Sequence, residues 1–179
     1  MGLNADKTKI MLIKKSKKGR KKKAISKEWE WLGKEIEKVD KFNYLGYMMT
    51  SDNSDEEHIK TQVGKARAVM GKIWGIGEKL CKEDWVRRMM IFKTLVKSII
   101  FYGEEVWGYK ECEEVEKVKK IYVKWVLGLK RSTPDYITRR ETKEGKIWEE
   151  AVFRILKYEE KLEGLSIEDI RKQIWLRKK

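Results

Sequence analysis

The sequence predicts an α+β protein in which a small antiparallel β-sheet precedes a mostly α-helical bundle. Short apolar or alternating segments lie within residues 9–50, and apolar residues recur at helical spacing from Ile59 onward. Hydrophobic residues make up 41% of the 179 residues, which is enough to build a buried core. We expect the sheet within residues 1–54 and the helices within residues 55–179.

Three segments favour β-structure. Residues 9–13 (KIMLI) form a short apolar segment typical of a strand, and residues 28–39 predict a strand pair around Gly33. Residues 42–50 predict a third, buried strand, in which Gly46 indicates a bulge or a close backbone approach. A sheet of this size is barely large enough to be stable alone.

Four later segments carry apolar residues every three or four positions, which predicts amphipathic helices. The stripes are Ile59, Val63, Ala66, Met70 and Ile73; Trp85, Met89, Phe92, Val96 and Ile99; Val115, Val118, Tyr122 and Trp125; and, after Pro134, Trp148, Val152, Ile155, Tyr158 and Leu162. Asp84 should cap the second helix. Met90, Ile91 and Leu95 widen its apolar face, so we expect it to be the most buried.

The C-terminal segment predicts one more helix. Gly164 should end the fourth helix, and Ser166 with Asp169 resembles a capping box, with Asp in place of the usual Glu. The last helix would then run through Ile170 and Ile174.

The charge of the chain favours an anionic partner. Charged residues make up 40% of the sequence and the net charge is +14. Residues 14–23 hold eight basic residues, so the rest of the chain carries 14 − 8 = +6. Such a block is typical of a solvated loop or tail, and it could also contact phosphates or act as a nuclear address. Nucleic acid is the first candidate partner and an acidic membrane surface the second.

The cysteine and histidine content and the absence of long apolar runs narrow the possible classes of protein. Cys81, Cys112 and the single histidine, His58, cannot form a zinc finger by local spacing, so we expect buried free thiols in a reducing compartment. The sequence shows no signal-peptide core and no apolar run near ~20 residues. These features predict an intracellular protein of the nucleus or cytoplasm. Of the two anionic candidates we therefore expect nucleic acid, and no membrane, as the partner.

No catalytic motif is present in the sequence. GxGxxG, Walker A, GxSxG and HExxH patterns are absent, as are Asp-Asp and Asp-x-Asp pairs. His58 follows two glutamates in the expected first turn of a helix and is predicted to lie on the surface. Glu104 and Glu105 are adjacent, so on a helix their side chains diverge. We therefore assign no catalytic residue, metal ligand or cofactor site.

Two predicted helices place basic residues beside their apolar stripes. On the third helix Lys117, Lys120 and Lys124 share one side, but three nearby glutamates partly neutralise it, which favours an ordinary solvated face. On the first helix the flanking pairs are Lys60 with Arg67 and Lys65 with Lys72. Glu78 is the one acid between Lys60 and Lys79, so this helix suits a phosphate backbone.

The order of several segments resembles a known family. LNADKTKIM (residues 3–11) resembles motif D, and FNYLGYMMTSD (residues 42–52) resembles motif E, the primer-grip hairpin, of reverse transcriptases from non-LTR (LINE-type) retrotransposons. HIKTQVGKARAVMGKIWG (58–75), FKTLVKSIIFYGEEVWG (92–108) and YVKWVLGLKRSTPDY (122–136) resemble the helical thumb and the region after it. The ordered set covers nearly the whole chain.

The resemblance implies RNA-directed DNA synthesis, which this chain could not carry out alone. The family copies RNA into DNA using two Mg²⁺ ions on palm aspartates that lie upstream of motif D. The chain is therefore expected to be a palm remnant plus thumb, inactive alone and without a cofactor of its own. A Cys/His knuckle found near the C-terminus in many relatives is absent. Its partners would be an RNA/DNA template–primer duplex and either the missing palm and fingers or another protein.

The resemblance and the charge pattern together give a set of candidate nucleic-acid-binding residues. Lys7 would lie near the phosphates of the incoming nucleotide, and the turn at residues 44–46 would hold the primer end. The full set is Lys7, Lys9, Tyr44, Leu45, Gly46, Lys60, Lys65, Arg67 and Lys72. Three alternatives stay open: a retroelement-derived binding or interaction protein without a polymerase role, a non-functional relic, and an active polymerase.

Overall fold

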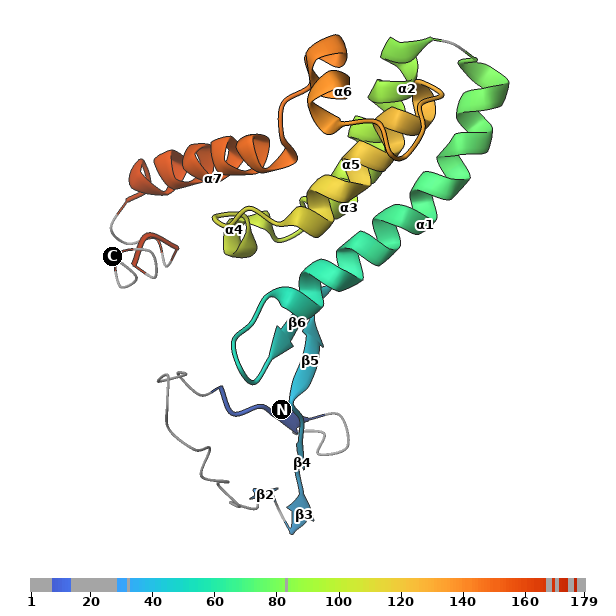
Figure 1. Cartoon of the computed structure of the whole chain (residues 1–179). Helices are drawn as coiled ribbons and strands as arrows, with labels where there is room; N and C mark the ends of the chain where they lie inside the picture. The colour runs from blue at the N-terminus through green and yellow to red at the C-terminus, as the bar shows by residue number, and fades with distance from the viewer. Residues whose placement is uncertain are drawn as a thin grey trace. The chain divides into compact units, whose positions relative to one another are not determined.

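The computed structural model describes residues 8–13, 29–31, 33–82, 84–166, 169, 171–173 and 176 (Figure 1). Strands and helices both occur, which confirms the α+β class. The chain divides into two compact units, Met1–His58 and Ile59–Lys179. Lys7, the basic block at residues 14–23, Ile170 and Ile174 lie outside the described residues.

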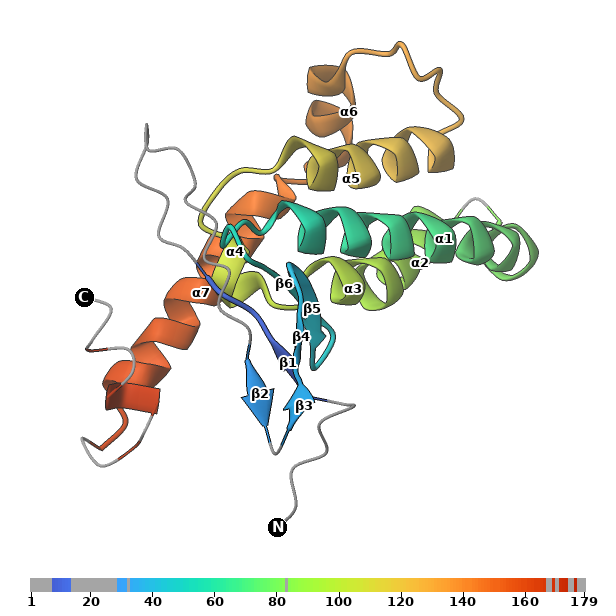
Figure 2. The same cartoon turned by 90° about the horizontal axis from the view of Figure 1, so that it is seen from below.

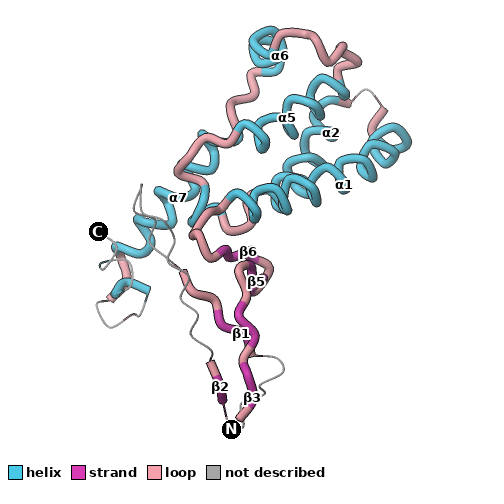
Figure 3. Tube along the Cα trace, turned by 60° about the horizontal axis from the view of Figure 1, so that its bottom comes forward, coloured by secondary structure: helices cyan, strands magenta, loops and turns pink. Residues whose placement is uncertain are grey.

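The first unit contains short strands interrupted by loops (Figure 3). β1 (Lys9–Ile10) pairs in parallel with β4 (Glu37–Lys38), β2 (Glu30–Trp31) pairs antiparallel with β3 (Lys34–Glu35), and β5 (Lys41–Tyr44) pairs antiparallel with β6 (Tyr47–Thr50). The strand pair around Gly33 is confirmed. The single antiparallel sheet is wrong, because residues 34–44 pair in turn with three different partners.

Residues 42–50 form a hairpin and not the single bulged strand that their composition predicts. Leu45 (φ 49°) and Gly46 (φ 85°) occupy the turn between β5 and β6. Positive φ at both turn residues is the signature of a type I′ turn, whose twist matches that of paired strands. The hairpin agrees with the form that the family resemblance implies. Its predicted burial is wrong, because all four residues of β5 are exposed.

The hairpin contacts His58, the last residue of the first unit, which lies in the first turn of helix α1 (Glu56–Leu80). The Tyr47 ring stacks on the imidazole with centroids 3.9 Å apart, and the Met48 N–H donates to His58 Nδ1 at 3.3 Å. Tyr47 Oη also donates to Asp55 at 2.8 Å. Burial of Tyr47 and its bond to Asp55 raise the pKa of the phenol. The expected surface histidine is therefore wrong: β6 covers His58 and leaves it buried.

The second unit is a helical bundle (Figure 2). After α1 come α2 (Trp85–Ile91), η1 (Phe92–Val96), α3 (Lys97–Ile100), α4 (Glu104–Trp107), α5 (Glu113–Val126), α6 (Asp135–Thr142) and α7 (Ile147–Glu163). The four predicted stripes fall on α1, α2 to α3, α5 and α7, which confirms those helices. α4 and α6 were not predicted, because each is short and follows a glycine or proline turn.

The second predicted helix is continuous through α2, η1 and α3 and contains one π-helical turn. Asp84 caps it as predicted, accepting a hydrogen bond from the Arg87 N–H at 3.0 Å. The wider π turn shifts the buried side by one position, so that Ile100 is buried in place of Ile99. Met90 and Leu95 are exposed, so the predicted wide apolar face is wrong, and α5 buries a comparable set of residues.

The cysteines and the hydropathy of the helices were also subjects of prediction. Cys81 and Cys112 are free and half-buried, so the expected full burial of both thiols is wrong. Over the described residues, none of the helices is both long enough and apolar enough to cross a lipid bilayer.

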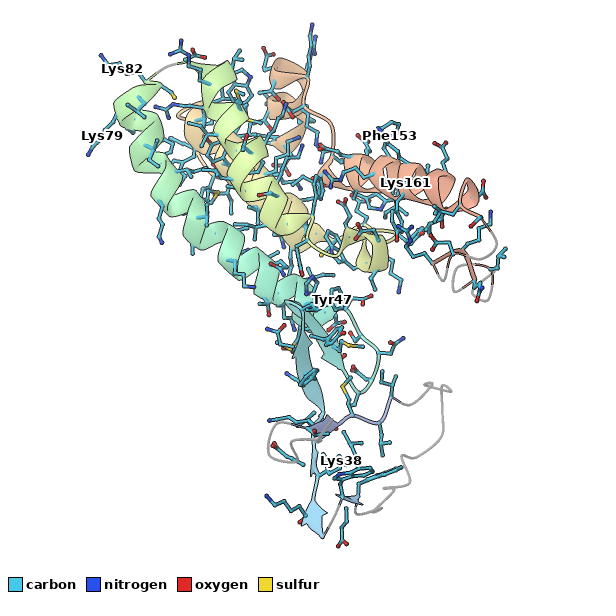
Figure 4. The ribbon with its side chains drawn as sticks, turned by 180° about the vertical axis from the view of Figure 1, so that it is seen from behind. Lys38, Tyr47, Lys79, Lys82, Phe153 and Lys161 are labelled. Carbon is cyan, nitrogen blue, oxygen red and sulfur yellow. The ribbon has the colours of Figure 1, made fainter. Side chains whose placement is uncertain are left out.

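The core of the bundle centres on Phe92, which is fully buried and stacks on Tyr122 with ring centroids 4.6 Å apart. Phe92→Ala is expected to lower the free energy of unfolding by about 3–5 kcal/mol, because it removes buried contacts and leaves a cavity. Urea denaturation measures this change. The matched control is Phe153→Ala on α7, an aromatic residue 67% exposed (Figure 4), for which we expect a change within about 0.5 kcal/mol. Equal losses in the two variants would contradict this description of the core.

Candidate nucleic-acid interface

The candidate residues fall on two surfaces, one in each unit. In the first unit the hairpin tip presents Tyr44 and Leu45, which are 58% and 77% exposed. Gly46 completes the turn beside them. Lys9, by contrast, forms an ion pair with Glu37 at 3.1 Å on the neighbouring strand. The tip is thus an aromatic and aliphatic surface, and the charge of Lys9 is already partly compensated.

In the second unit the basic residues of α1 form two rows. Lys60 and Arg67 are seven residues apart, about two helical turns, so they share one side of the helix. Lys65, Lys72 and Lys79 repeat at the same interval on the other side. All five side chains are exposed. We call these the Lys60 row and the Lys65 row, and together the basic face.

A strip of small residues runs between the two rows. Its members are Gly64, Ala68, Gly71 and Gly75, all exposed. A Cβ built on any of the three glycines would meet no described atom within 4 Å. Glycine inside a helix costs about 1 kcal/mol relative to alanine. Packing within the described part of the chain therefore gives no reason for glycine here, and the strip leaves the helix backbone open to close approach from outside.

The cations of the basic face differ in their pairing from those of α5. None of the five on α1 forms an ion pair with a residue that the structure describes. On α5 the four pairs are Lys117–Glu113 at 3.2 Å, Lys119–Glu144 at 2.9 Å, and Lys120 and Lys124 with Asp135 at 2.8 and 2.7 Å. The charge of α1 is therefore available to an external anion, whereas much of that on α5 is compensated within the bundle.

The C-terminal half of α1 is held against its neighbours by aromatic contacts. Trp74 stacks on Trp125 of α5, with ring centroids 4.1 Å apart and planes at 10°. The buried Arg88 lies over the Trp74 ring at 5.1 Å and pairs with Glu78 at 2.7 Å. α1 and α5 consequently lie side by side (Figure 2), and Lys79 points away from the end of α1 (Figure 4). These contacts fix which side of α1 faces solvent.

The two ion pairs of Glu144 should make the free energy of unfolding depend on pH in the acid range. Lys93 and Lys119 both donate to the half-buried Glu144, at 2.8 and 2.9 Å. Burial alone would raise the pKa of Glu144, but the two lysines lower it below the ordinary value of 4.5. Because the folded-state pKa is depressed, this stabilisation is present above the unfolded pKa and is lost as the pH falls through the folded one.

We therefore expect the free energy of unfolding to fall below about pH 4.5, and Glu144→Gln to weaken that dependence. Urea denaturation between pH 3 and pH 7 measures both. Glu160→Gln on the exposed side of α7 is the matched control. If Glu144→Gln kept the pH dependence of the wild type, Glu144 would not be a source of the loss of stability in acid.

The segment Tyr-Gly-x-Glu-x-Trp, at residues 102–107, has a structural role in this fold. Gly103 adopts a left-handed φ of 74°, and the Trp107 indole donates to the Tyr102 carbonyl at 3.3 Å. Glu104 is buried and pairs with Arg154, whereas Glu105 is exposed, so these acids diverge as predicted. Burial raises the pKa of Glu104 even though Arg154 opposes the shift.

The arrangement on α1 is chemically able to offer cations to phosphate groups and to let an external group approach the helix backbone closely. Within the described residues, no three His, Cys, Asp or Glu side chains gather closely enough to hold a metal ion. The glycine strip was missed in the sequence, although the spacing of Gly64 and Gly71 repeats that of the basic rows. Comparisons with protein-family models, with curated proteins and with solved structures found no match to this chain.

Proposed function

We propose that the chain binds a nucleic-acid duplex as the primer-grip and thumb part of a non-LTR retrotransposon reverse transcriptase. In this role it holds the RNA/DNA template–primer and performs no chemistry alone. The observation that carries the proposal is the basic face of α1, whose exposed cations have no ion pair among the described residues. The ordered resemblance of the sequence motifs gives the proposal its family.

The two rows suit a duplex better than a single strand. The minor groove of an A-form duplex is wide and shallow, and an α-helix is about 10 Å across. With the small-residue strip against the floor of the groove, the Lys60 row and the Lys65 row reach the phosphates of opposite strands. Such contacts do not depend on base identity, so the binding is tolerant of sequence.

The hairpin tip supplies a second kind of contact. Tyr44 is exposed beside the turn, and an aromatic ring stacks on any base with an energy of about 1–3 kcal/mol. In the proposed role, Tyr44 and Leu45 hold the terminal base of the primer, while Gly46 lets the backbone come close. The type I′ turn and the stacking of Tyr47 on His58 keep the tip in place.

Filter binding of the purified chain to RNA–DNA hybrids of several unrelated sequences tests the proposal. We expect comparable affinity for all of them at ~50 mM salt, where phosphate contacts are strongest. Primer extension with Mg²⁺ and deoxynucleotides should give no product. The absence of binding at low salt would overturn the proposal, and robust incorporation would overturn the statement that the chain is inactive alone.

A retroelement-derived protein-interaction module is the second candidate, and exposed apolar side chains favour it. Phe153 and Leu156 lie one turn apart on α7 and are 67% and 51% exposed, and Tyr136 on α6 is 72% exposed. An exposed apolar pair such as Phe153 and Leu156 is the kind of feature that occurs on association surfaces. A discrete oligomer in analytical ultracentrifugation, combined with no binding to the hybrid, would favour this candidate over the first.

A further inference from the structure

A second basic surface lies on α5, apart from the basic face of α1. A groove of about 240 Å³ opens between α5, the connection 127–134 and the first turn of α6. Its charged lining consists of Lys117, Lys120, Lys124, Arg131, Glu113 and Asp135. The sequence showed three of these lysines on one side of the helix, and the structure adds Arg131 and an open groove beside them.

The groove carries an excess of positive charge. Four cations and two carboxylates line it, which leaves a formal charge of 4 − 2 = +2. Hydrogen bonds from Lys120 and Lys124 lower the pKa of Asp135, so one carboxylate is shared by two lysines and remains ionised. Arg131 forms no ion pair with a described residue. The local charge is thus incompletely compensated.

One existing ion pair can exchange its partner at little cost. Lys117 and Glu113 are 3.2 Å apart, with 50% and 74% of their side-chain surfaces exposed. Exposed pairs of this kind contribute little to stability, because solvent screens both charges. An incoming anion can therefore take Lys117 from Glu113, and it finds Arg131 already available. An arginine with a lysine is well suited to phosphate, because guanidinium donates two parallel hydrogen bonds.

The walls of the groove are fixed before any ligand arrives. Lys124 Nζ donates to the Arg131 carbonyl at 3.1 Å, and the Leu129 N–H donates to the Lys124 carbonyl at 2.8 Å. Gly128, with φ 63°, makes the turn between them. At about 30 Å³ per water, the groove holds roughly eight waters, which is enough for a phosphate group and its hydration. It is smaller than typical pockets for organic ligands, which begin at about 300 Å³.

We propose that this groove binds a backbone phosphate of the same nucleic acid that contacts α1. The inference rests on the proposed function and extends the interface from α1 to α5. Both helices belong to the same unit, and the stacked Trp74 and Trp125 join them. Arg67 lies about two turns before Trp74 on the same side of α1, and Lys124 directly precedes Trp125, so each helix carries a cation within about two turns of this contact.

Salt-dependent binding of a fluorescent RNA–DNA hybrid tests the groove. The variant Lys117→Ala/Arg131→Ala leaves the Lys120–Asp135 and Lys124–Asp135 pairs in place. We expect it to reduce the log–log salt slope by about 1–2 units and the affinity at 100 mM salt by roughly 10-fold. Lys157→Ala/Lys161→Ala removes the same charge from exposed positions of α7, of which Figure 4 labels Lys161, and should bind within about twofold of the wild type.

Lysine acetylation of the unmodified chain gives a readout that does not require the variant to fold. With the hybrid bound, Lys117 should become less reactive, while Lys157 should not change. A wild type that binds the hybrid without protection of Lys117, or a groove variant that binds as the wild type does, would overturn the inference alone. A wild type that does not bind the hybrid would overturn the proposed function and the groove with it.

Discussion

Replacing four cations of the basic face with glutamine is expected to lower the affinity for an RNA–DNA hybrid at 100 mM salt by at least about 100-fold. The substitutions are Lys60→Gln, Lys65→Gln, Arg67→Gln and Lys72→Gln. Each phosphate contact contributes about 0.9 to the log–log salt slope, so four contacts account for about 3.6. All four side chains are exposed, so the variant should fold as the wild type does. Fluorescence anisotropy measures the affinity and circular dichroism the fold.

The matched control removes the same charge elsewhere in the second unit. Lys110, Arg140, Lys157 and Lys161 are exposed, and none forms an ion pair with a described residue. Their replacement with glutamine should cost far less affinity, because net charge acts over a distance and is screened beyond about 10 Å at 0.1 M salt. Equal losses in the two variants would mean that net charge, and not the basic face, governs binding.

Substitutions at the three glycines of the small-residue strip should stabilise the helix, and large side chains there should weaken nucleic-acid binding. Gly64→Ala, Gly71→Ala and Gly75→Ala together are expected to raise the free energy of unfolding by about 2–3 kcal/mol, since alanine favours the helix by about 1 kcal/mol at each position. The added methyl groups meet no described atom within 4 Å, so no clash offsets this gain. Urea denaturation measures the change.

A larger side chain on the strip should then block close approach. Gly64→Leu/Gly71→Leu is expected to lower hybrid affinity by roughly 10-fold or more while the helix remains stable, because leucine is a good helix former. Ser98→Leu on the exposed side of α3 is the control and should bind as the wild type does. Undiminished binding by the leucine variant would place the strip outside the interface.

Periodicity made the helical part of the fold predictable. Val63, Ala66, Met70 and Ile73 are buried at the spacing that the sequence shows, because a helix can satisfy its backbone locally and needs only one apolar face. The π turn at η1 (Phe92–Val96) was not predictable in this way, since one extra residue in a turn leaves no mark on local composition.

Strand pairing was less predictable than helix formation. Residues 34–44 carry little apolar periodicity, and their partners β2, β1 and β6 are set by chain geometry and not by pattern. The prediction for His58 was wrong for a related reason. Its charged sequence neighbours suggested exposure, but the Tyr47 ring stacks on it and the Met48 N–H of β6 donates to it. Strand pairing and the burial of His58 both depend on contacts between segments, which the local sequence pattern does not show.

For the candidate site, the sequence identified the cations but did not show which of them form ion pairs within the fold. Lys60, Lys65, Arg67 and Lys72 were found from spacing, and they prove to be exposed. The pairing of Lys120 and Lys124 with Asp135, which distinguishes α5 from α1, depends on where α6 begins. That helix was not predicted, so the contrast between the two basic surfaces emerged only from the structure.

The proposed function depends above all on binding of the phosphate backbone of a duplex by α1. Its most direct test is a titration of the wild-type chain with a fluorescent RNA–DNA hybrid at several salt concentrations between about 50 and 300 mM. We expect tight binding at the lowest salt and a log–log slope of about −3.6 or steeper. No binding at about 50 mM salt, or an affinity that does not change with salt, would contradict it.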